Sequence, residues 1–138
     1  ICVGMQMLFD SSDEFGQHLG LGLIKGKVKK LSCQENKNSM SFLPHMGWNS
    51  LSVGSYFRNT EFDQSFNQYF LHSYAVTDIE ESKILYQCNY GGQTFIAAVK
   101  DRNLAGLQFH PERSGNEGMK ILNNLVKLLS KEYPSLKI

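Results

Sequence analysis

Apolar positions near the start of the chain follow a helical spacing. Met5, Leu8 and Phe9 lie on one helical face before a polar stretch at 10–13, a pattern typical of an amphipathic helix and its end. The spacing predicts a helix of about ten residues that begins just after Cys2. Cys2 is therefore expected at a helix N-terminus.

A longer apolar stripe occupies the last part of the chain. Ser114 followed three residues later by Glu117 has the spacing of a capping box, and apolar side chains then repeat at helical intervals. The sequence predicts a helix over residues 115–131, ended by Tyr133 and Pro134. Its predicted buried stripe consists of Met119, Leu122, Leu125, Val126 and Leu129.

Between these helices the clearest signal is a meander of strands. The apolar and aromatic runs at 83–90 and 93–100 are separated by two glycines, which tolerate the positive φ angles of a two-residue hairpin turn. A third run at 104–109 leads directly into His110. We therefore predict three strands that deliver a histidine at a strand end.

The segments before the meander give weaker signals. Aromatic and β-branched residues at 68–76 predict a strand, and 23–24 and 27–31 predict short strands. The segment 42–49, FLPHMGWN, mixes Pro, Gly and Trp and fits neither a helix nor a long strand. The polar residues 34–41 predict a surface loop.

Length and charge narrow the class of protein. A chain of 138 residues is long enough for one hydrophobic core, so we predict one domain over 1–138. The 14 Lys and Arg residues against 13 Asp and Glu give a net charge of +1, so nothing calls for a nucleic-acid partner. No apolar stretch approaches the roughly 18 residues of a membrane span. We expect a soluble, cytoplasmic protein with no membrane partner.

Cysteine and histidine usage gives no reason to expect a metal. Cys2, Cys33 and Cys88 are odd in number and widely spaced, which argues against a disulfide framework or a zinc knuckle and favours reduced thiols. No pair of histidines has the spacing of a zinc site, and no metal or other cofactor is expected. His45 and His72 lie in aromatic surroundings and are candidates for hydrogen-bonded structural residues.

Cys2 has the local chemistry of a nucleophile. The unpaired N–H groups and dipole of a helix N-terminus lower the pKa of a thiol and favour the thiolate. The Cys2-Val3-Gly4 spacing matches the second half of a nucleophile elbow, a strained strand-to-helix turn in which small residues relieve crowding. On these three residues alone, a buried inert cysteine is the stronger alternative.

The sequence His110-Pro111-Glu112 supplies the groups that a thiol nucleophile needs. Side chains at i and i+2 of an extended segment point to the same side, and Pro111 restricts the backbone at both His110 and itself. Glu112 can then orient the imidazole as a general base, with the far ring nitrogen left for a thiol. A solvated polar loop is the alternative, but the chain order of nucleophile, histidine and acid favours catalysis.

With these residues in place, the sequence resembles the triad-type, class I glutamine amidotransferases over essentially its whole length. ICVGMQ is similar to the family's Gly-x-Cys-x-Gly-x-Gln elbow, and LQFHPERSG to its His-x-Glu segment. PHMGWN and YFLHSY are similar to narrower signatures of the glutaminase subunits of imidazole glycerol phosphate synthases. The resemblance implies an α/β, flavodoxin-like fold with a mixed sheet in a three-layer arrangement.

The resemblance also implies roles for particular residues. Cys2 would attack the side-chain amide of glutamine, and His110, oriented by Glu112, would take the thiol proton and then protonate the departing ammonia. Water would hydrolyse the γ-glutamyl thioester, and the backbone N–H of Val3 would donate to the oxyanion. The implied substrate-binding residues are Val3, Gln6, Glu14, Ser73 and Tyr74.

A partner is implied as well. Ammonia would pass to a (β/α)₈-barrel cyclase subunit, in a heterodimer that makes imidazole glycerol phosphate and AICAR in histidine biosynthesis. The implied contact face consists of His45, Met46, Trp48, Asn49, Tyr69 and Arg113. Two alternatives stay open: a paralogue that supplies ammonia for amination of a surface sugar, and a non-catalytic fragment that only docks a partner.

In the family, the strand that enters the elbow and the loop with the second oxyanion donor precede the position of Ile1. We therefore expect the chain to begin partway through a longer enzyme, without the N-terminal βα units. For the same reason we expect these 138 residues by themselves to have little stability or activity.

Overall fold

The structure is a computed structural model that describes residues 1–32 and 42–132. Cys33, the loop predicted at 34–41 and the helix end predicted at Tyr133 and Pro134 lie outside the described residues.

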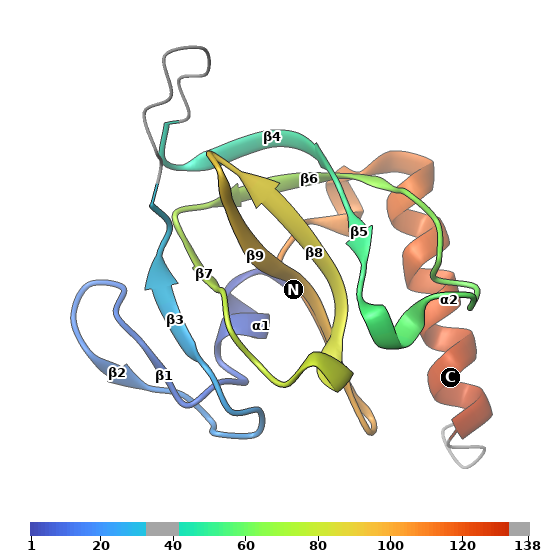
Figure 1. Ribbon diagram of the computed structural model, residues 1–138, viewed down its shortest axis with the longest axis horizontal. Coiled ribbons are helices and arrows are strands. Elements are labelled where there is room, and N and C mark those ends of the chain that lie inside the picture. Colours follow the sequence, from blue (N-terminus) through green and yellow to red (C-terminus); the bar gives the residue numbers. More distant parts are fainter. Residues whose placement is uncertain (33–41, 133–138) are drawn as a thin grey trace.

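The described chain combines two helices with three sheets (Figure 1). The first sheet has the order β2-β1-β3-β7 and comprises β1 (Ser11–Ser12), β2 (His18–Leu19), β3 (Lys27–Lys30) and β7 (Tyr74–Val76). The second has the order β10-β9-β8-β5 and comprises β5 (Ser52–Val53), β8 (Ile84–Tyr90), β9 (Gln93–Asp101) and β10 (Leu104–Leu107). The third is a ribbon of β4 (His45–Ser50) and β6 (Asn67–His72). The helices are α1 (Val3–Gln6) and α2 (Gly115–Glu132), and short 3₁₀ turns cover Ser55–Phe57, Glu81–Lys83 and Pro111–Arg113.

The β8–β9 hairpin crosses the middle of the molecule, with β3 and β7 on one side and α2 on the other (Figure 1). The predicted meander is confirmed: β8 pairs with β9 and β9 with β10, all antiparallel. Gly91 and Gly92 form the turn with φ angles of 60° and 80°, which suit a type I′ hairpin turn. The ladder continues past β10, where the N–H of Gln108 donates to Ala97 O, and so carries the chain directly to His110.

Strand β9 is buried on both faces and divides the core. Side chains alternate along a strand, so Phe95 and Ala97 join the large cluster toward the ribbon and α2, whereas Ile96 joins a smaller one beneath α1. Val99 also joins the smaller cluster, beyond a register irregularity in the β8–β9 ladder. The smaller cluster includes Met5 and supports the turn that carries Cys2.

The predicted ten-residue helix after Cys2 is wrong in length, because α1 has four residues. The carbonyls that a longer helix would use accept bonds from a returning loop instead: Leu21 N–H donates to Met7 O and Leu23 N–H to Leu8 O. The predicted strand at 23–24 is therefore not formed, and only the following run becomes a strand, β3. Phe9 is nevertheless fully buried. The apolar spacing therefore identified a buried residue correctly, although the segment is not helical there.

The expectation that 42–49 fits neither a helix nor a long strand is wrong from His45 onward. The six residues of β4 pair in register with β6, with His45 opposite His72 and Trp48 opposite Tyr69. Pairing with a strand of high β-propensity overrides the glycine in β4. The strand predicted at 68–76 is confirmed, with an interruption at Ser73 between β6 and β7.

Helix α2 is confirmed over nearly its predicted range, but it is rotated relative to the predicted stripe. Gly118, Ile121 and Leu125 are its buried residues, whereas Met119 and Val126 are 53% and 40% exposed. A Cβ atom on Gly118 would lie 2.1 Å from the carbonyl oxygen of Pro111. The close approach of the 3₁₀ turn at Gly118 sets the rotation of the helix.

The predicted capping box is not formed. Ser114 Oγ donates to His110 O at 2.7 Å, and the Glu117 carboxylate accepts the N–H of Asn67. Both side chains therefore tie the start of α2 to its surroundings rather than to each other.

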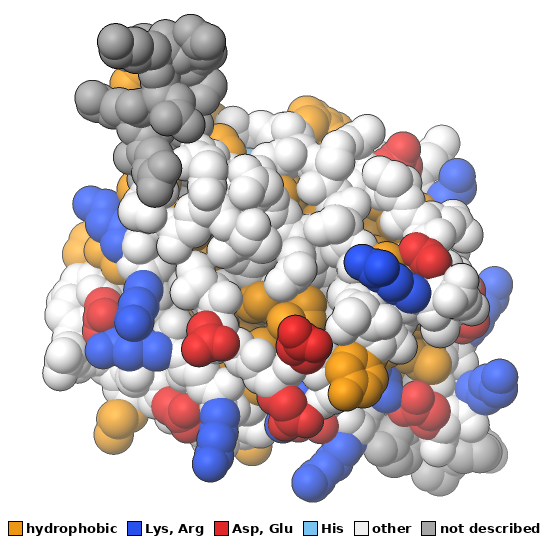
Figure 2. Space-filling view, in the orientation of Figure 1, with side chains coloured by type: hydrophobic (Ala, Val, Ile, Leu, Met, Phe, Trp, Pro, Cys, Tyr) orange, Lys and Arg blue, Asp and Glu red, His pale blue; other side chains and the backbone are white. Residues whose placement is uncertain are grey.

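The face shown in Figure 2 carries charges of both signs, with Lys and Arg side chains interspersed with Asp and Glu. The net charge of the chain is +1. Within the described ranges, no helix is long and apolar enough to cross a membrane.

Candidate active site

Cys2 stands on a strained turn that precedes α1 and lies against the end of β10. Its φ and ψ are 48° and −115°, a region that L-residues rarely occupy and that costs about 1–3 kcal/mol. The turn is held by Cys2 N–H, which donates to Leu107 O at 2.6 Å. This backbone agrees with the predicted elbow. A Cβ on Gly4 would meet no atom within 4 Å, so the expected relief of crowding there is not seen among the described residues.

The Cys2 sulfur is half-buried and has two polar neighbours. It donates toward Leu71 O at 3.8 Å and accepts from Gln108 Nε2 at 3.6 Å. Burial raises the pKa of the thiol, and the Glu14 carboxylate adds to this, although the Val3 backbone N–H acts in the opposite direction. The expectation of a lowered pKa is therefore wrong for this state, because one helical turn is too short for its dipole to outweigh burial.

His110 and Glu112 form a close pair. His110 Nδ1 lies 2.7 Å from Glu112 Oε1, so Nδ1 carries the proton toward the carboxylate and Nε2 is left as the basic nitrogen. Partial burial would raise the pKa of the Glu112 carboxyl, but the hydrogen bond from His110 outweighs it and lowers the pKa. The geometry agrees with the predicted orienting role, although it is formed on a 3₁₀ turn rather than on an extended segment.

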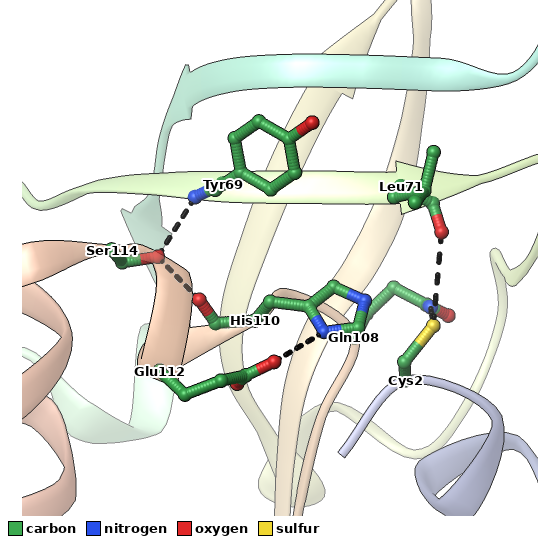
Figure 3. Close-up of polar contacts among 7 residues, drawn as sticks. All are labelled: Cys2, Tyr69, Leu71, Gln108, His110, Glu112 and Ser114. Carbon is green, nitrogen blue, oxygen red and sulfur yellow. Dashed lines mark hydrogen bonds and ion pairs between the residues drawn. The ribbon is translucent and has the colours of Figure 1, made fainter.

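The backbone of His110 is clamped to strand β6 (Figure 3). His110 N–H donates to Tyr69 O at 2.8 Å. Ser114 Oγ donates to His110 O at 2.7 Å and accepts the N–H of Tyr69 at 2.9 Å. Ser114 is 2% exposed, so water does not compete for these bonds. The clamp fixes the position of the imidazole relative to β6.

Strand β6 also contacts the thiol, through Leu71 O. Strand β10 brings Cys2 and His110 together. The Cys2 N–H donates a hydrogen bond to the carbonyl oxygen of Leu107, three residues before the histidine. No hydrogen bond joins Cys2 Sγ to His110 among the contacts of the described residues, and the thiol is instead held by Leu71 and Gln108.

A pocket of about 490 Å³ opens beside the thiol. Its lining includes Cys2 and every residue predicted to bind substrate, namely Val3, Gln6, Glu14, Ser73 and Tyr74. Gln6 is 6% exposed and uses Nε2 on Tyr74 O at 2.8 Å and Gln108 Oε1 at 3.0 Å. Its Oε1 is thus the atom of that amide that can still accept a hydrogen bond from a bound molecule.

The predicted contact face is only partly a surface. Met46 and Trp48 are 61% and 58% exposed on the outer face of the β4–β6 ribbon, where the Trp48 ring meets the edge of Tyr69. The Arg113 guanidinium lies over the Tyr69 ring at 4.3 Å. Asn49 is partly buried, and its Nδ2 donates to Asn89 O.

His45 is a correction to the predicted face. It is 2% exposed and stacks on Phe70 and Tyr90, because it alternates with Met46 along β4 and so points inward. His72 is likewise buried among aromatic rings, with Nδ1 bonded to Tyr74 O at 3.0 Å. The interpretation as a hydrogen-bonded structural residue agrees with His72, whereas His45 is held by ring packing and its buried Nδ1 has no hydrogen-bond partner among the described residues.

Sequence reasoning did not identify Gln108, Ser114 or Leu71 as parts of this site. A signal existed for Gln108, a polar residue in an apolar strand two positions before His110, where side chains share one face. Leu71 contributes only its carbonyl oxygen, for which its side chain gives no signal.

A strained cysteine beside a pocket, with a histidine–carboxylate pair at the 3₁₀ turn that follows β10, is the arrangement of enzymes that use a thiol nucleophile on an α/β fold. The chain belongs to the family Glutamine amidotransferase class-I, whose family model matches residues 1–128. This membership supports the predicted flavodoxin-like α/β fold.

The individual relatives of the chain belong to one type of protein within this family. The chain is similar to imidazole glycerol phosphate synthase subunit HisH of Bacillus subtilis (strain 168), with 42% identity over 137 residues that cover 96% of this chain and 62% of that protein. The HisH subunit of Sulfurimonas denitrificans is 42% identical over 92% of this chain and 60% of its own length. That of Prochlorococcus marinus is 39% identical over 99% and 62%. The chain therefore spans about three fifths of these relatives.

Proposed function

We propose that the protein hydrolyses glutamine to glutamate and ammonia through a thioester on Cys2, as the glutaminase subunit of an imidazole glycerol phosphate synthase. The observation that carries the proposal is the 2.7 Å pair of His110 Nδ1 and Glu112 Oε1. It lies at the 3₁₀ turn just after β10, the strand that holds the strained Cys2 turn beside the pocket. Membership in the glutamine amidotransferase family gives the reaction class.

The first step is activation of a neutral thiol. Because burial raises the pKa of Cys2 and the thiol faces Leu71 O, the resting sulfur keeps its proton. Rotation of the side chain away from Leu71 brings the sulfur toward His110 Nε2, which accepts the proton. Glu112 stabilises the imidazolium that forms.

Acylation and hydrolysis then use the same groups. The thiolate attacks the side-chain amide carbon of glutamine, and the Val3 N–H at the start of α1 donates to the developing oxyanion. His110 returns its proton to the amide nitrogen, the C–N bond breaks, and ammonia leaves the γ-glutamyl thioester on Cys2. His110 next takes a proton from water, and the hydroxide adds to the thioester. The C–S bond then breaks to release glutamate, and His110 returns its proton to the Cys2 sulfur.

The polar rim of the pocket suits the α-amino and carboxylate groups of glutamine. The Glu14 carboxylate and the free Oε1 of Gln6 attract the α-ammonium, and the segment at Ser73 and Tyr74 binds the α-carboxylate. All four residues line the pocket with Cys2. A free amino acid, rather than a peptide, is the expected substrate.

We further propose a heterodimer with a (β/α)₈-barrel cyclase in the cytoplasm, whose reducing conditions keep Cys2 as a thiol. The relatives are named as subunits of imidazole glycerol phosphate synthase, and the exposed Met46 and Trp48 give the ribbon an apolar face for a partner. Tyr69 and Arg113 extend this face to the turn that carries His110. Copurification with a cyclase, rather than a sugar-modifying enzyme, tests the identity of the acceptor.

A glutamine-like electrophile tests the chemistry of the site. The diazoketone analogue of glutamine should alkylate Cys2 and abolish glutamine hydrolysis, and the modified peptide is identified by mass spectrometry. Cys88, which is 1% exposed and whose pKa burial raises to about 12, serves as the internal control. Inactivation without modification of Cys2, or equal labelling of Cys88, would overturn the proposal.

A further inference from the structure

We propose that Gln108 is a positioning residue, which holds the Cys2 sulfur with a side-chain N–H and favours its thiolate form. The inference rests on the proposed function, because it assigns a residue to the activation of the same thiol. Gln108 is fully buried at the end of β10, and its Nε2 lies 3.6 Å from Cys2 Sγ (Figure 3).

The orientation of the Gln108 amide is fixed by a chain of hydrogen bonds. Gln6 Nε2 lies 2.8 Å from the carbonyl oxygen of Tyr74, which only accepts hydrogen bonds, so this end of the Gln6 amide is its NH₂ group. The same NH₂ group donates to Gln108 Oε1 at 3.0 Å. The other end of the Gln108 amide, Nε2, must then face the sulfur.

A buried N–H group that points at a sulfur atom stabilises its thiolate form. An unpaired amide donor in the interior is costly, and a hydrogen bond to an ionised acceptor is stronger than one to a neutral acceptor. The Gln108 N–H therefore favours the thiolate over the thiol. This effect opposes the burial that raises the pKa of Cys2, and it comes from β10 rather than from the α1 turn.

Gln6 acquires a second role from this arrangement. Its NH₂ group locks Gln108, while its Oε1 remains available at the pocket. Occupation of the pocket by the substrate ammonium is thereby linked to the thiol through two amide groups. Among the described residues, no other glutamine donates a hydrogen bond to the sulfur.

The test is the alkylation of Cys2 by iodoacetamide at fixed pH, read peptide by peptide in the absence of glutamine. The substitution Gln108→Met removes the donor and keeps the length of the side chain. Loss of a hydrogen bond to a charged acceptor changes the thiol equilibrium about tenfold to a hundredfold. Since nucleophilicity rises with the pKa, the alkylation rate should fall less, about three- to tenfold. The isosteric Gln108→Glu, with a carboxylate beside the sulfur, should slow alkylation at least as much.

Gln68→Met is the matched control. Gln68 is also fully buried, and its amide has no hydrogen-bond partner within the described chain, so the same substitution should leave the alkylation rate unchanged. A purely structural effect of Gln108→Met would loosen the packing around Cys2 and speed alkylation, which would overturn the proposal. Wild-type rates for both Gln108 variants would overturn it as well. Because no glutamine turnover enters the readout, these outcomes are independent of whether Cys2 is the glutaminase nucleophile.

Discussion

We predict that a pair of buried histidines makes the protein sensitive to mild acid. His45 is 2% exposed, with its ring 4.7 Å from the ring of Phe70 and 3.9 Å from that of Tyr90. His72 is 7% exposed and lies edge-on to His45 at 5.2 Å. Burial lowers the pKa of each to about 4, and for His72 the neighbouring His45 adds to the effect. Both rings are therefore neutral in the folded protein at pH 7.

The sign and size of the effect follow from proton linkage. An unfolded histidine binds its proton near pH 6.5, so between pH 6.5 and 4 the unfolded chain holds more protons than the folded one, and stability falls as the pH falls. At pH 5 each histidine with a folded pKa of about 4 lowers the free energy of unfolding by about 2 kcal/mol relative to pH 7. The two together predict a loss of about 4 kcal/mol, a large part of the stability of a domain. The Glu112 carboxyl, whose pKa is lowered, affects stability only as the pH falls toward the ordinary glutamate pKa of about 4.3.

Urea unfolding at pH 7 and pH 5 measures this loss directly. His45→Phe keeps an aromatic ring in the stack and should reduce the loss by about half, to about 2 kcal/mol. His18→Phe, at an exposed position, should leave the loss unchanged. An equal loss in wild type and His45→Phe would refute the assignment of acid sensitivity to the buried pair.

Two further substitutions test the site and the partner face. Ser114→Ala removes the hydroxyl that joins His110 O to the N–H of Tyr69. The free energy of unfolding in urea should fall by about 1–3 kcal/mol, and glutamine hydrolysis should slow. An unchanged kcat would show that the clamp does not position the base. Trp48→Ala should weaken binding to the cyclase by about 2 kcal/mol in a calorimetric titration. Tyr56→Ala, which removes another aromatic side chain that is 67% exposed, should bind normally, and equal losses for the two variants would exclude a specific contact at Trp48.

The sequence could predict those elements whose signals are local. The hairpin follows from two glycines at positive φ, and the long helix from its apolar repeat. The length of α1 could not be predicted, because the carbonyls of Met7 and Leu8 are taken by backbone N–H groups at Leu21 and Leu23. That competition arises only from how the following loop folds back.

In the candidate site, too, local signals could be predicted and contacts between distant segments could not. The pairing of His110 with Glu112 follows from their spacing, and the predicted pocket residues gather around Cys2. The raised pKa of Cys2 and the contact with Gln108 depend on burial and on packing between β10 and α1, which spacing along the chain does not encode. The inward position of His45 required the register of β4, which a segment with Pro and Gly obscured.

The central claim is that Cys2 is the nucleophile of a glutaminase that supplies ammonia to a partner. Synthesis by the complex, measured separately with glutamine and with ammonium, tests it most directly in the Cys2→Ser variant. We predict that glutamine-dependent synthesis is abolished while ammonium still supports the partner's reaction. Retention of glutamine-dependent synthesis, or loss of both activities, would contradict the account, the latter by showing that Cys2 is structural.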